Sequence, residues 1–428
     1  MLEQFIKNRI IANLSFVPNE GQHELLDKLS RFVVSSDRQK AFILLGYAGT
    51  GKTSIIAALV QAYKELQQKI VLLAPTGRAA KVISRYASTP AYTIHKYIYR
   101  QKQLGEAVFT LNDNLHKNTL FIVDEASMIS GVRDNTMFGS GTLLDDLVKY
   151  VYSGEGCSML LLGDDAQLPP VGSLISPALQ SDYMQKYGLH VTCSILTEVA
   201  RQAMDSGILR NASKIRPVAL GEGQIPHSTW DLLEESSDFI HITGAEVSEK
   251  LEQSYKEVGV EEVMLLTRTN KRTNIYNQGI RTRILWREEE IETGDRLMVS
   301  KNNYFWTEKY DGLPFLANGD ILEIKRLRNV RELYGFRFAD AQLRSLDYDW
   351  EIDAVVWLDT IYSDSPEANN ELHKQLFEHI AEDYPELAKS KKKLIETIYQ
   401  SPYYNALQMR FAYAVTGHKA QGGQWKHV

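Results

Sequence analysis

The chain has 428 residues, which is more than one hydrophobic core usually supports, so we expect two or three domains. Apolar residues make up 44% of the chain and charged residues 24%, and this composition excludes a largely disordered protein. The net charge of −6 argues against a surface coated for duplex binding, although it does not exclude a narrow basic groove.

The small number of cysteines and the amino-terminal residues indicate the cellular compartment of the protein. Only Cys157 and Cys193 are present, and neither has a partner at metal-ligand spacing, so we expect a reducing environment with both thiols buried. The start, Met1-Leu2-Glu3, carries early charge and no secretory apolar region, and no apolar run reaches membrane-spanning length. We therefore predict a cytoplasmic protein with no membrane partner.

The first strong motif is Gly46-Tyr47-Ala48-Gly49-Thr50-Gly51-Lys52-Thr53, which fits the phosphate-loop pattern G-x-x-x-x-G-K-[ST]. The apolar run before it predicts a buried strand, and the run after it predicts a helix whose amino terminus faces the phosphates. A chance match of a glycine-rich turn is the alternative. Lys52 is predicted to reach the β- and γ-phosphates, and the Thr53 hydroxyl to ligate Mg²⁺. The predicted nucleotide-binding residues here are Gly46, Ala48, Gly49, Thr50, Gly51, Lys52, Thr53 and Ser54.

From about residue 20 to 200 the sequence alternates between strand-like and helix-like segments, which predicts a parallel sheet covered on both faces. The predicted strands are Phe42–Leu45, Ile70–Ala74, Leu120–Val123 and Met159–Leu162. Between the second and third of them, 97–103 and 107–111 flank Leu104-Gly105-Glu106 and predict a projecting β-hairpin.

A second α/β region is expected after residue 201, with a strand at 263–266 and a helix at 270–283. From about residue 297 to 358, short aromatic and β-branched runs with intervening turns predict a small all-β module, most simply a barrel. Residues 367–400 are predicted to be helical and highly charged, and the final apolar segment 411–416 is strand-like.

Two further strands end in polar residues. Asp124 and Glu125 follow an apolar strand; Asp124 is placed to hold Mg²⁺ opposite Thr53, and Glu125 to deprotonate the attacking water. The other strand leads into Gly163-Asp164-Asp165-Ala166-Gln167, in which Gln167 could contact the γ-phosphate or the water. An exposed strand end and a proline-rich turn are the respective alternatives.

In this order, the motifs resemble those of superfamily 1 helicases. Gly46–Thr53, 124–127 and 163–170 are similar to motifs I, II and III, and the nearest resemblance is to the RecD-like and Dda-like group, which translocates 5′ to 3′. Five more segments resemble the Q motif, motif Ia, motif Ib, the arginine segment and motif V, namely 18–22, 73–80, 93–95, 198–202 and 415–422. The resemblance covers nearly the whole chain.

The resemblance implies roles for single residues. Gln22 would read the adenine edge of ATP, and Arg201 would reach the γ-phosphate as an arginine finger beside Lys52, Asp124, Glu125 and Gln167. A surface ion pair for Arg201, a buried His95 and simple packing of Phe109 remain the alternatives. The implied DNA contacts are Pro75, Thr76, Arg78, His95, Phe109, Thr416, His418 and Lys419.

The resemblance also implies an α/β architecture with two RecA-like P-loop domains. Residues 1–200 would form core domain 1A, with a pin hairpin, 1B, at about 97–118; residues 201–296 with 403–428 would form core domain 2A. Residues 297–402 would form an SH3-like insertion, 2B, that includes the charged helical segment. Mg-ATP would bind between the two core domains.

The chain departs from the family pattern at its end. The family continues past motif V to motif VI, whose arginine contacts the γ-phosphate, whereas this sequence stops at Lys426-His427-Val428. We therefore expect weak ATP turnover from the 428-residue form.

The sequence thus predicts an ATP-dependent DNA helicase that moves 5′ to 3′ on single-stranded DNA. It would act as a monomer on single strands and duplex junctions, with nuclease, replication or repair partners. Two alternatives stay open: a RecD-like motor subunit (alpha chain) of an exodeoxyribonuclease complex, and a nucleotide-dependent DNA remodelling protein that does not unwind.

Overall fold

The computed structural model describes residues 1–101, 109–133, 139–170, 172–198, 206–221, 233–307, 309–310, 315–346, 350–363, 366–387 and 390–428. Among these, the residues up to Ile242 form one compact unit, and those from Thr243 to Val428 form a second. The first unit therefore extends beyond the predicted boundary at residue 200. It does so because the helix α8 (Gly207–Ala219) is tied to the first unit by an ion pair between Arg216 and Asp164.

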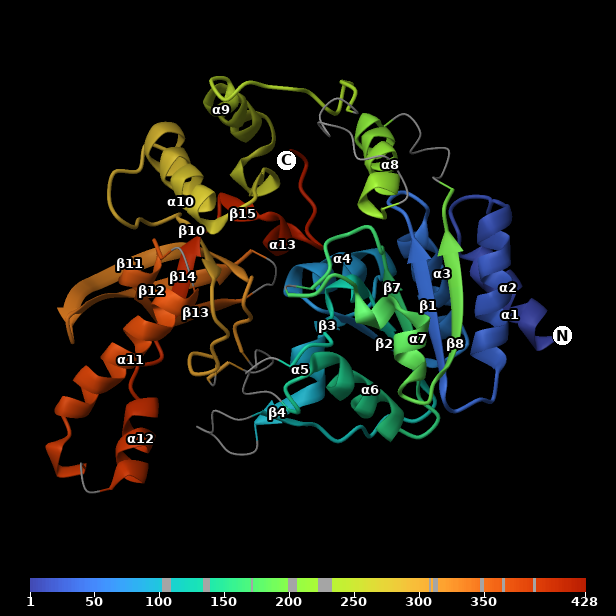
Figure 1. Ribbon diagram of the computed structural model, residues 1–428, viewed down its shortest axis with the longest axis horizontal. Helices are drawn as coiled ribbons and strands as arrows, with labels where there is room; N and C mark the ends of the chain where they lie inside the picture. The colour runs from blue at the N-terminus through green and yellow to red at the C-terminus, as the bar shows by residue number, and fades with distance from the viewer. Residues whose placement is uncertain are drawn as a thin grey trace. The chain divides into compact units, whose positions relative to one another are not determined.

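The first unit is built on a six-stranded sheet in the order β3-β2-β6-β7-β1-β8, and all of its neighbouring strands run parallel (Figure 1). The four predicted strands are confirmed. The prediction lacks β3 and β8, because β3 has only three residues and β8 is partly exposed along the sheet edge. The strands are β1 Lys40–Gly46, β2 Lys69–Ala74, β3 Ala91–Thr93, β6 Thr119–Val123, β7 Ser158–Gly163 and β8 His190–Leu196.

Helices cover this sheet, and apolar side chains of α1, α2 and α3 share one core cluster with β1, β2, β6 and β7. Helix α2 begins at a capping box, in which the Asn19 side chain accepts from the Gln22 backbone and the Gln22 side chain accepts from the Asn19 backbone. The α-helices of this unit besides α8 are α1 Leu2–Ala12, α2 Glu20–Val34, α3 Lys52–Glu65, α4 Gly77–Ala87, α5 Ile94–Ile98, α6 Leu143–Ser153 and α7 Ser181–Gln185.

An antiparallel hairpin is present where the sequence predicts one. Strand β4 (Tyr99–Gln101) pairs with β5 (Phe109–Leu111), and Tyr99 lies opposite Leu111. The predicted turn at 104–106 lies outside the described residues. The structure therefore gives the base of the hairpin, and its use as a duplex-splitting pin stays a prediction.

The second unit contains a closed barrel of β10, β11, β12, β13 and β14. This architecture confirms the predicted all-β module, and the SH3-like label stays a prediction. The barrel differs from the prediction in its last strand: β14 was assigned to the neighbouring core domain, yet it pairs with both β10 and β13 and closes the ring. The barrel strands are β10 Arg296–Val299, β11 Ile321–Leu333, β12 Phe336–Ser345, β13 Glu351–Trp357 and β14 Leu407–Phe411.

The charged helical segment between β13 and β14 forms two helices, α11 (Pro366–Glu382) and α12 (Lys391–Tyr399), as predicted. Each helix packs apolar side chains against the barrel. Trp357, which is fully buried, packs in one cluster with Leu376, Ile380 and Ile398. This burial explains why so charged a segment is ordered beside the barrel.

The rest of the second unit is a two-stranded parallel sheet with its helices, in which β15 pairs with β9. The predicted helix 270–283 is confirmed and divides into α10 and a π-helical turn at Ile280–Ile284. These elements are α9 Val247–Val258, β9 Leu265–Thr267, α10 Asn270–Gly279, β15 Ala414–Thr416 and α13 Gly417–Ala420.

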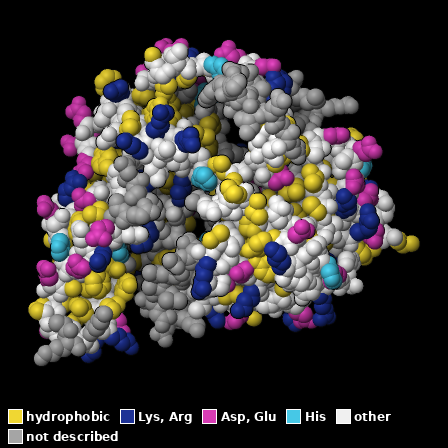
Figure 2. Space-filling model, viewed as in Figure 1, with side chains coloured by type: hydrophobic (Ala, Val, Ile, Leu, Met, Phe, Trp, Pro, Cys, Tyr) yellow, Lys and Arg dark blue, Asp and Glu magenta, His cyan; other side chains and the backbone are white. Residues whose placement is uncertain are grey.

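The distribution of charged side chains agrees with the expectation from composition, but the burial of the cysteines agrees only in part. In the face drawn in Figure 2, basic and acidic side chains are interspersed, as the modest net charge leads one to expect. Cys157 is buried, but Cys193 is exposed on the edge strand β8, so the expectation that both thiols are buried is wrong for Cys193. Across the described ranges, no helix is both long and apolar enough to cross a lipid bilayer.

The buried carboxylate of Asp295 holds the second unit together. It is fully buried and accepts hydrogen bonds from Arg281 at 2.9 and 2.8 Å, from Arg287 at 2.5 Å and from the Tyr413 hydroxyl at 2.9 Å. The bonds join the segment before β10 to the segment after β14. Because both arginines would lose their counter-charge, removing this carboxylate should leave buried, unpaired cations.

We predict that Asp295→Asn lowers the free energy of unfolding of this unit by about 3–5 kcal/mol. Urea denaturation followed by tryptophan fluorescence measures it, since five of the six tryptophans lie from Trp286 onward. As a matched control, Glu252→Gln removes an exposed pair with Lys256 and should change the stability by less than about 0.5 kcal/mol. Equal effects of the two substitutions would contradict the assignment.

Candidate nucleotide site and nucleic-acid interface

The predicted catalytic segments of the first unit lie at one edge of its sheet. The phosphate loop follows β1, Asp124 and Glu125 follow β6, and Asp164 to Gln167 follow β7. Because β6, β7 and β1 are adjacent and parallel, their carboxyl ends bring these three loops together. The sheet order therefore assembles residues that are more than a hundred positions apart in the sequence.

The phosphate loop has the backbone that its glycines allow. Gly49 and Gly51 have φ angles of 75° and 87°, which favour glycine, and Gly51 directly precedes α3. At Gly46, a Cβ atom would lie 2.9 Å from the Lys52 side chain, so only glycine leaves room for it. The Thr50 hydroxyl is buried and donates to the Tyr47 carbonyl at 2.8 Å, which closes the loop.

Lys52 lies inside this loop at the start of α3. Its ammonium group donates to the Gly46 carbonyl and, at 3.0 Å, to the Tyr47 carbonyl. Burial lowers the pKa of Lys52, while the negative charges of Asp164, Glu125 and Asp124 oppose this shift. The lysine is therefore under the influence of Asp124 and Glu125, which the sequence assigns to this site, and of Asp164 in the loop after β7.

Asp124 and Glu125 form a coupled acidic pair at the end of β6. The Glu125 backbone is left-handed, with φ 52°, and its N–H donates to the Asp124 carboxylate at 2.9 Å. Burial raises the pKa of both, and the charge of Asp124 raises that of Glu125 further, to about 7. A carboxylate with a pKa near neutrality is a better proton acceptor than an ordinary one.

Asp164 organises the loop after β7. Its carboxylate accepts from the Ala166 N–H at 3.0 Å, and its carbonyl accepts from the Gln167 N–H at 3.2 Å. A residue that the sequence analysis missed, Arg216 on α8, grips the same carboxylate with two hydrogen bonds of 3.0 and 2.7 Å. No local pattern marks Arg216, because its partner lies 52 positions earlier.

Gln22 makes structural hydrogen bonds next to the phosphate loop. It is 2% exposed; its amide nitrogen donates to the Thr50 carbonyl at 3.0 Å, and its amide oxygen accepts from the Asn19 N–H at 3.0 Å. In this structure the side chain joins α2 to the phosphate loop. Its amide nitrogen and oxygen can each make one more hydrogen bond, so reading the adenine edge stays a prediction.

The predicted DNA contacts of the first unit fall into two groups. Pro75 and Thr76 follow β2, and the Thr76 side chain caps α4, which begins with Gly77 and Arg78. By contrast, the desolvation of His95 lowers its pKa to about 4, so its ring is neutral at physiological pH. Phe109 is 6% exposed, which supports packing and is against stacking on a base pair without a rearrangement.

In the second unit, Thr416 and Lys419 line a cavity of about 280 Å³ beside the barrel. The cavity also contains Lys301 and Arg410, and none of its lining residues is acidic. Lys419 donates to the Asn318 side chain at 2.6 Å. His418, the third predicted contact, is exposed on α13. Three cations without a lining carboxylate favour a negatively charged ligand.

Arg201 and its neighbours 199–205 lie outside the described residues, so its predicted role as an arginine finger stays a prediction. Across the described ranges, no group of three or more His, Cys, Asp or Glu residues could hold a metal ion. A magnesium ion held by Thr53, Asp124 and phosphate oxygens would not need such a group.

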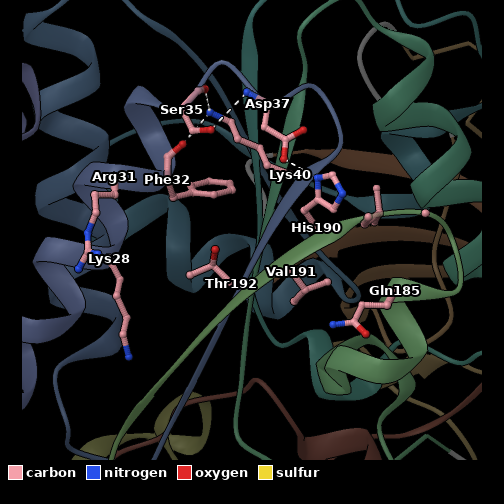
Figure 3. A pocket seen from close by; sticks show the side chains of 12 residues that line it. Lys28, Arg31, Phe32, Ser35, Asp37, Lys40, Gln185, His190, Val191 and Thr192 are labelled. Carbon is pink, nitrogen blue, oxygen red and sulfur yellow. Dashed lines mark hydrogen bonds and ion pairs between the residues drawn. The ribbon is translucent and has the colours of Figure 1, made fainter.

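A larger cavity of about 810 Å³ lies at the opposite end of the same sheet, where β1 and β8 begin (Figure 3). Several of its polar side chains make hydrogen bonds or ion pairs within the first unit. The Lys40 ammonium donates to the Phe32 and Ser35 carbonyls at 2.6 and 2.5 Å and so caps α2, and His190 Nδ1 lies 2.7 Å from the Asp37 carboxylate. None of its lining residues belongs to the phosphate site.

The matches to known proteins cover different parts of the chain. The AAA domain family matches residues 18–242. An uncharacterised protein of Acanthamoeba polyphaga mimivirus is 26% identical over 96% of this chain and 92% of its own length. The ATP-dependent DNA helicase dda of enterobacteria phage T4 is 24% identical over 71% of this chain and 66% of its own length.

Two further similarities are shorter or more distant. The ATP-dependent RecD2 DNA helicase of Deinococcus radiodurans is 28% identical over 45% of this chain, which is 23% of its own length. Among solved structures, the Pif1 helicase from Bacteroides in complex with ADP-AlF3 and single-stranded DNA is 13% identical, with a TM-score of 0.47 over 95% of this chain and 85% of that one.

The resemblance to superfamily 1 helicases of the RecD and Dda type is therefore confirmed by relatives as well as by motifs. Because the family match covers more than half of its residues, the chain belongs to the AAA domain family.

Proposed function

We propose that this protein is an ATP-dependent DNA helicase that moves 5′ to 3′ on single-stranded DNA. One observation carries the ATP-hydrolysing part of the proposal: the phosphate loop, the Asp124–Glu125 pair and the loop of Gln167 meet at one edge of a parallel sheet. The unwinding of DNA and its direction are proposed from the similarity to the Dda and RecD2 helicases. Phosphoryl transfer to water needs such a cradle, a metal ligand, a base and a group that senses the γ-phosphate.

The residues present fit ATP and Mg²⁺. The left-handed glycines and the amino terminus of α3 form a cradle for phosphates, and a hydroxyl and a carboxylate, from Thr53 and Asp124, are oxygen ligands of the kind that Mg²⁺ prefers. When bound, the ion would neutralise part of the charge on the β- and γ-phosphates. Lys52 would exchange its bonds to the Gly46 and Tyr47 carbonyls for bonds to phosphate oxygens.

The remaining steps fall to the protein's own side chains. Glu125 would accept a proton from the attacking water, and its raised pKa of about 7 makes it a stronger base than an ordinary carboxylate. Gln167, held by its backbone bond to Asp164, would contact the γ-phosphate or the water. Arg201 would place its positive charge beside the γ-phosphate oxygens. There it would stabilise the negative charge as the bond between the β- and γ-phosphates breaks.

Single-stranded DNA is the partner that the second unit's cavity favours. Lys301, Arg410 and Lys419 would bind phosphates of the backbone, and Thr416 and Asn318 lie among them. Asn369 also lines the cavity; it is 3% exposed, and its amide oxygen accepts no hydrogen bond in the described structure. A donor on a base or sugar would satisfy that oxygen.

We predict that Lys52→Ala lowers ATP turnover by at least roughly a hundredfold, because the transferred phosphate loses its main cation. Unwinding should disappear with it, whereas DNA binding should persist. Lys64→Ala on the same helix is the matched control, since it removes only a bond to the Ser88 carbonyl. A phosphate-release assay on both variants decides, and unwinding that survives Lys52→Ala would end the proposal.

Direction is tested on DNA duplexes with a single-stranded tail at either the 5′ or the 3′ end. The proposal expects ATP-dependent strand displacement from the 5′-tailed duplex and none from the 3′-tailed one, with Lys52→Ala inactive on both. The opposite preference would reverse the direction. DNA-stimulated ATP hydrolysis without displacement of either substrate would favour the remodelling alternative, and activity seen only with a nuclease partner would favour the motor-subunit alternative.

The cavity of the second unit makes a separate prediction. Lys301→Ala and Lys419→Ala should each weaken binding of single-stranded DNA and lower the salt dependence, log K against log salt concentration, by about 0.7 per lost phosphate contact. Lys325→Ala, on the barrel strand β11 outside this cavity, should leave the slope unchanged. Fluorescence anisotropy titrations between low and high salt measure it, and identical slopes for all three variants would exclude the cavity as a DNA site.

A further inference from the structure

One guanidinium group joins three parts of the first unit. Arg216 of α8 bonds Asp164 twice and Asp165 once, at 2.7 Å, in the loop after β7. Its central carbon also lies 3.4 Å from the ring centroid of Tyr47, which belongs to the phosphate loop. The Arg216 and Asp164 side chains are 9% and 6% exposed, so this contact is removed from solvent.

The contact bears on charge at the phosphate site. Asp164 is the carboxylate with the largest effect on Lys52, so it lies close to the group that would bind phosphate. Asp164 and Asp165 together place two negative charges beside the loop that a triphosphate must enter. A polyanion would be repelled by them unless a cation compensates, and Arg216 is the cation that bonds both.

Other side chains of α8 make contacts of a different kind. Asn211 of α8 exchanges hydrogen bonds with the Glu234 backbone at 2.8 and 3.0 Å, and Asp238 accepts from the Ser206 hydroxyl and the Gly207 N–H at 2.7 and 2.9 Å. These bonds join α8 to the segment that follows it, whereas the contacts of Arg216 join it to the two loops of the phosphate site.

We propose that Arg216 is a positioning residue of the phosphate site: it neutralises Asp164, fixes the loop that carries Gln167 and supports Tyr47 of the phosphate loop. The inference rests on the proposed nucleotide binding and adds a residue to it. Arginine suits this place because its planar group can pair with a carboxylate through two bonds and stack on a ring at the same time.

The test is the affinity for a fluorescent ADP analogue, mant-ADP, measured in EDTA so that metal ligation does not contribute. Arg216→Gln should bind about tenfold more weakly than the wild type, because the Asp164 charge is left uncompensated beside the phosphates. Asp164→Asn, which keeps the acceptor for the Ala166 N–H, should bind more tightly than the wild type. The double variant, a neutral pair, should bind within about threefold of the wild type.

The order of affinities separates a charge role from a merely structural one. If Arg216 only stabilised the fold, the double variant would bind no better than Arg216→Gln, and that result would overturn the proposal. Arg216→Lys should be intermediate, since it keeps the charge and loses the stacking on Tyr47. If Arg216→Gln does not fold, Asp164→Asn and the double variant still give the predicted order with the wild type.

Lys214→Gln is the matched control on the same helix, because Lys214 pairs only with the exposed Glu234 among the described ion pairs. It should bind mant-ADP like the wild type. Failure of the wild type itself to bind would overturn both this inference and the proposed function. Binding by the wild type with an unchanged Arg216→Gln would overturn this inference alone.

Discussion

Crowding of charge at the carboxyl edge of the first unit's sheet is the constraint on which the site depends. Lys52, Asp124, Glu125 and Asp164 come from three adjacent loops and influence one another through a poorly solvated region. None of them can keep its charge there without a partner. The hydrogen bonds of Arg216 to Asp164 and of the Glu125 N–H to Asp124 supply such partners from within the chain.

How far the sequence predicts this site depends on the distance between partners along the chain. The phosphate loop is contiguous, so its glycines, lysine and flanking strand and helix can be recognised together. Asp124 and Glu125 carry a weaker local signal, a strand followed by two carboxylates, which gains meaning from the loop upstream. Arg216 has no such signal, because the bonds that define it form only when α8 folds back onto the loop after β7.

The elements of the fold likewise divide into those with a local sequence signal and those without one. Long apolar runs predict β1, β2, β6 and β7, because a strand buried on both faces needs them. This criterion does not recognise an edge strand, because part of such a strand faces solvent. In β8, for example, Cys193 and Ile195 are exposed. Short aromatic and β-branched runs predict the barrel from the sequence. Its closure by β14 cannot be predicted in this way, because β14 pairs with β10 and β13 and is separated from β13 in the chain by two helices.

The bonds of Lys52 help to fix the shape of the phosphate loop. A buried ammonium group needs acceptors, and here the Gly46 and Tyr47 carbonyls supply them while the Thr50 hydroxyl and the Gln22 amide tie the loop on its other side. These bonds order the loop backbone, and an entering phosphate would replace the carbonyl oxygens around Lys52 with its own oxygens. Binding energy that would otherwise be lost to ordering the loop remains for holding the nucleotide. The stacking of Arg216 on Tyr47 acts in the same direction, because it fixes the residue whose carbonyl Lys52 must release.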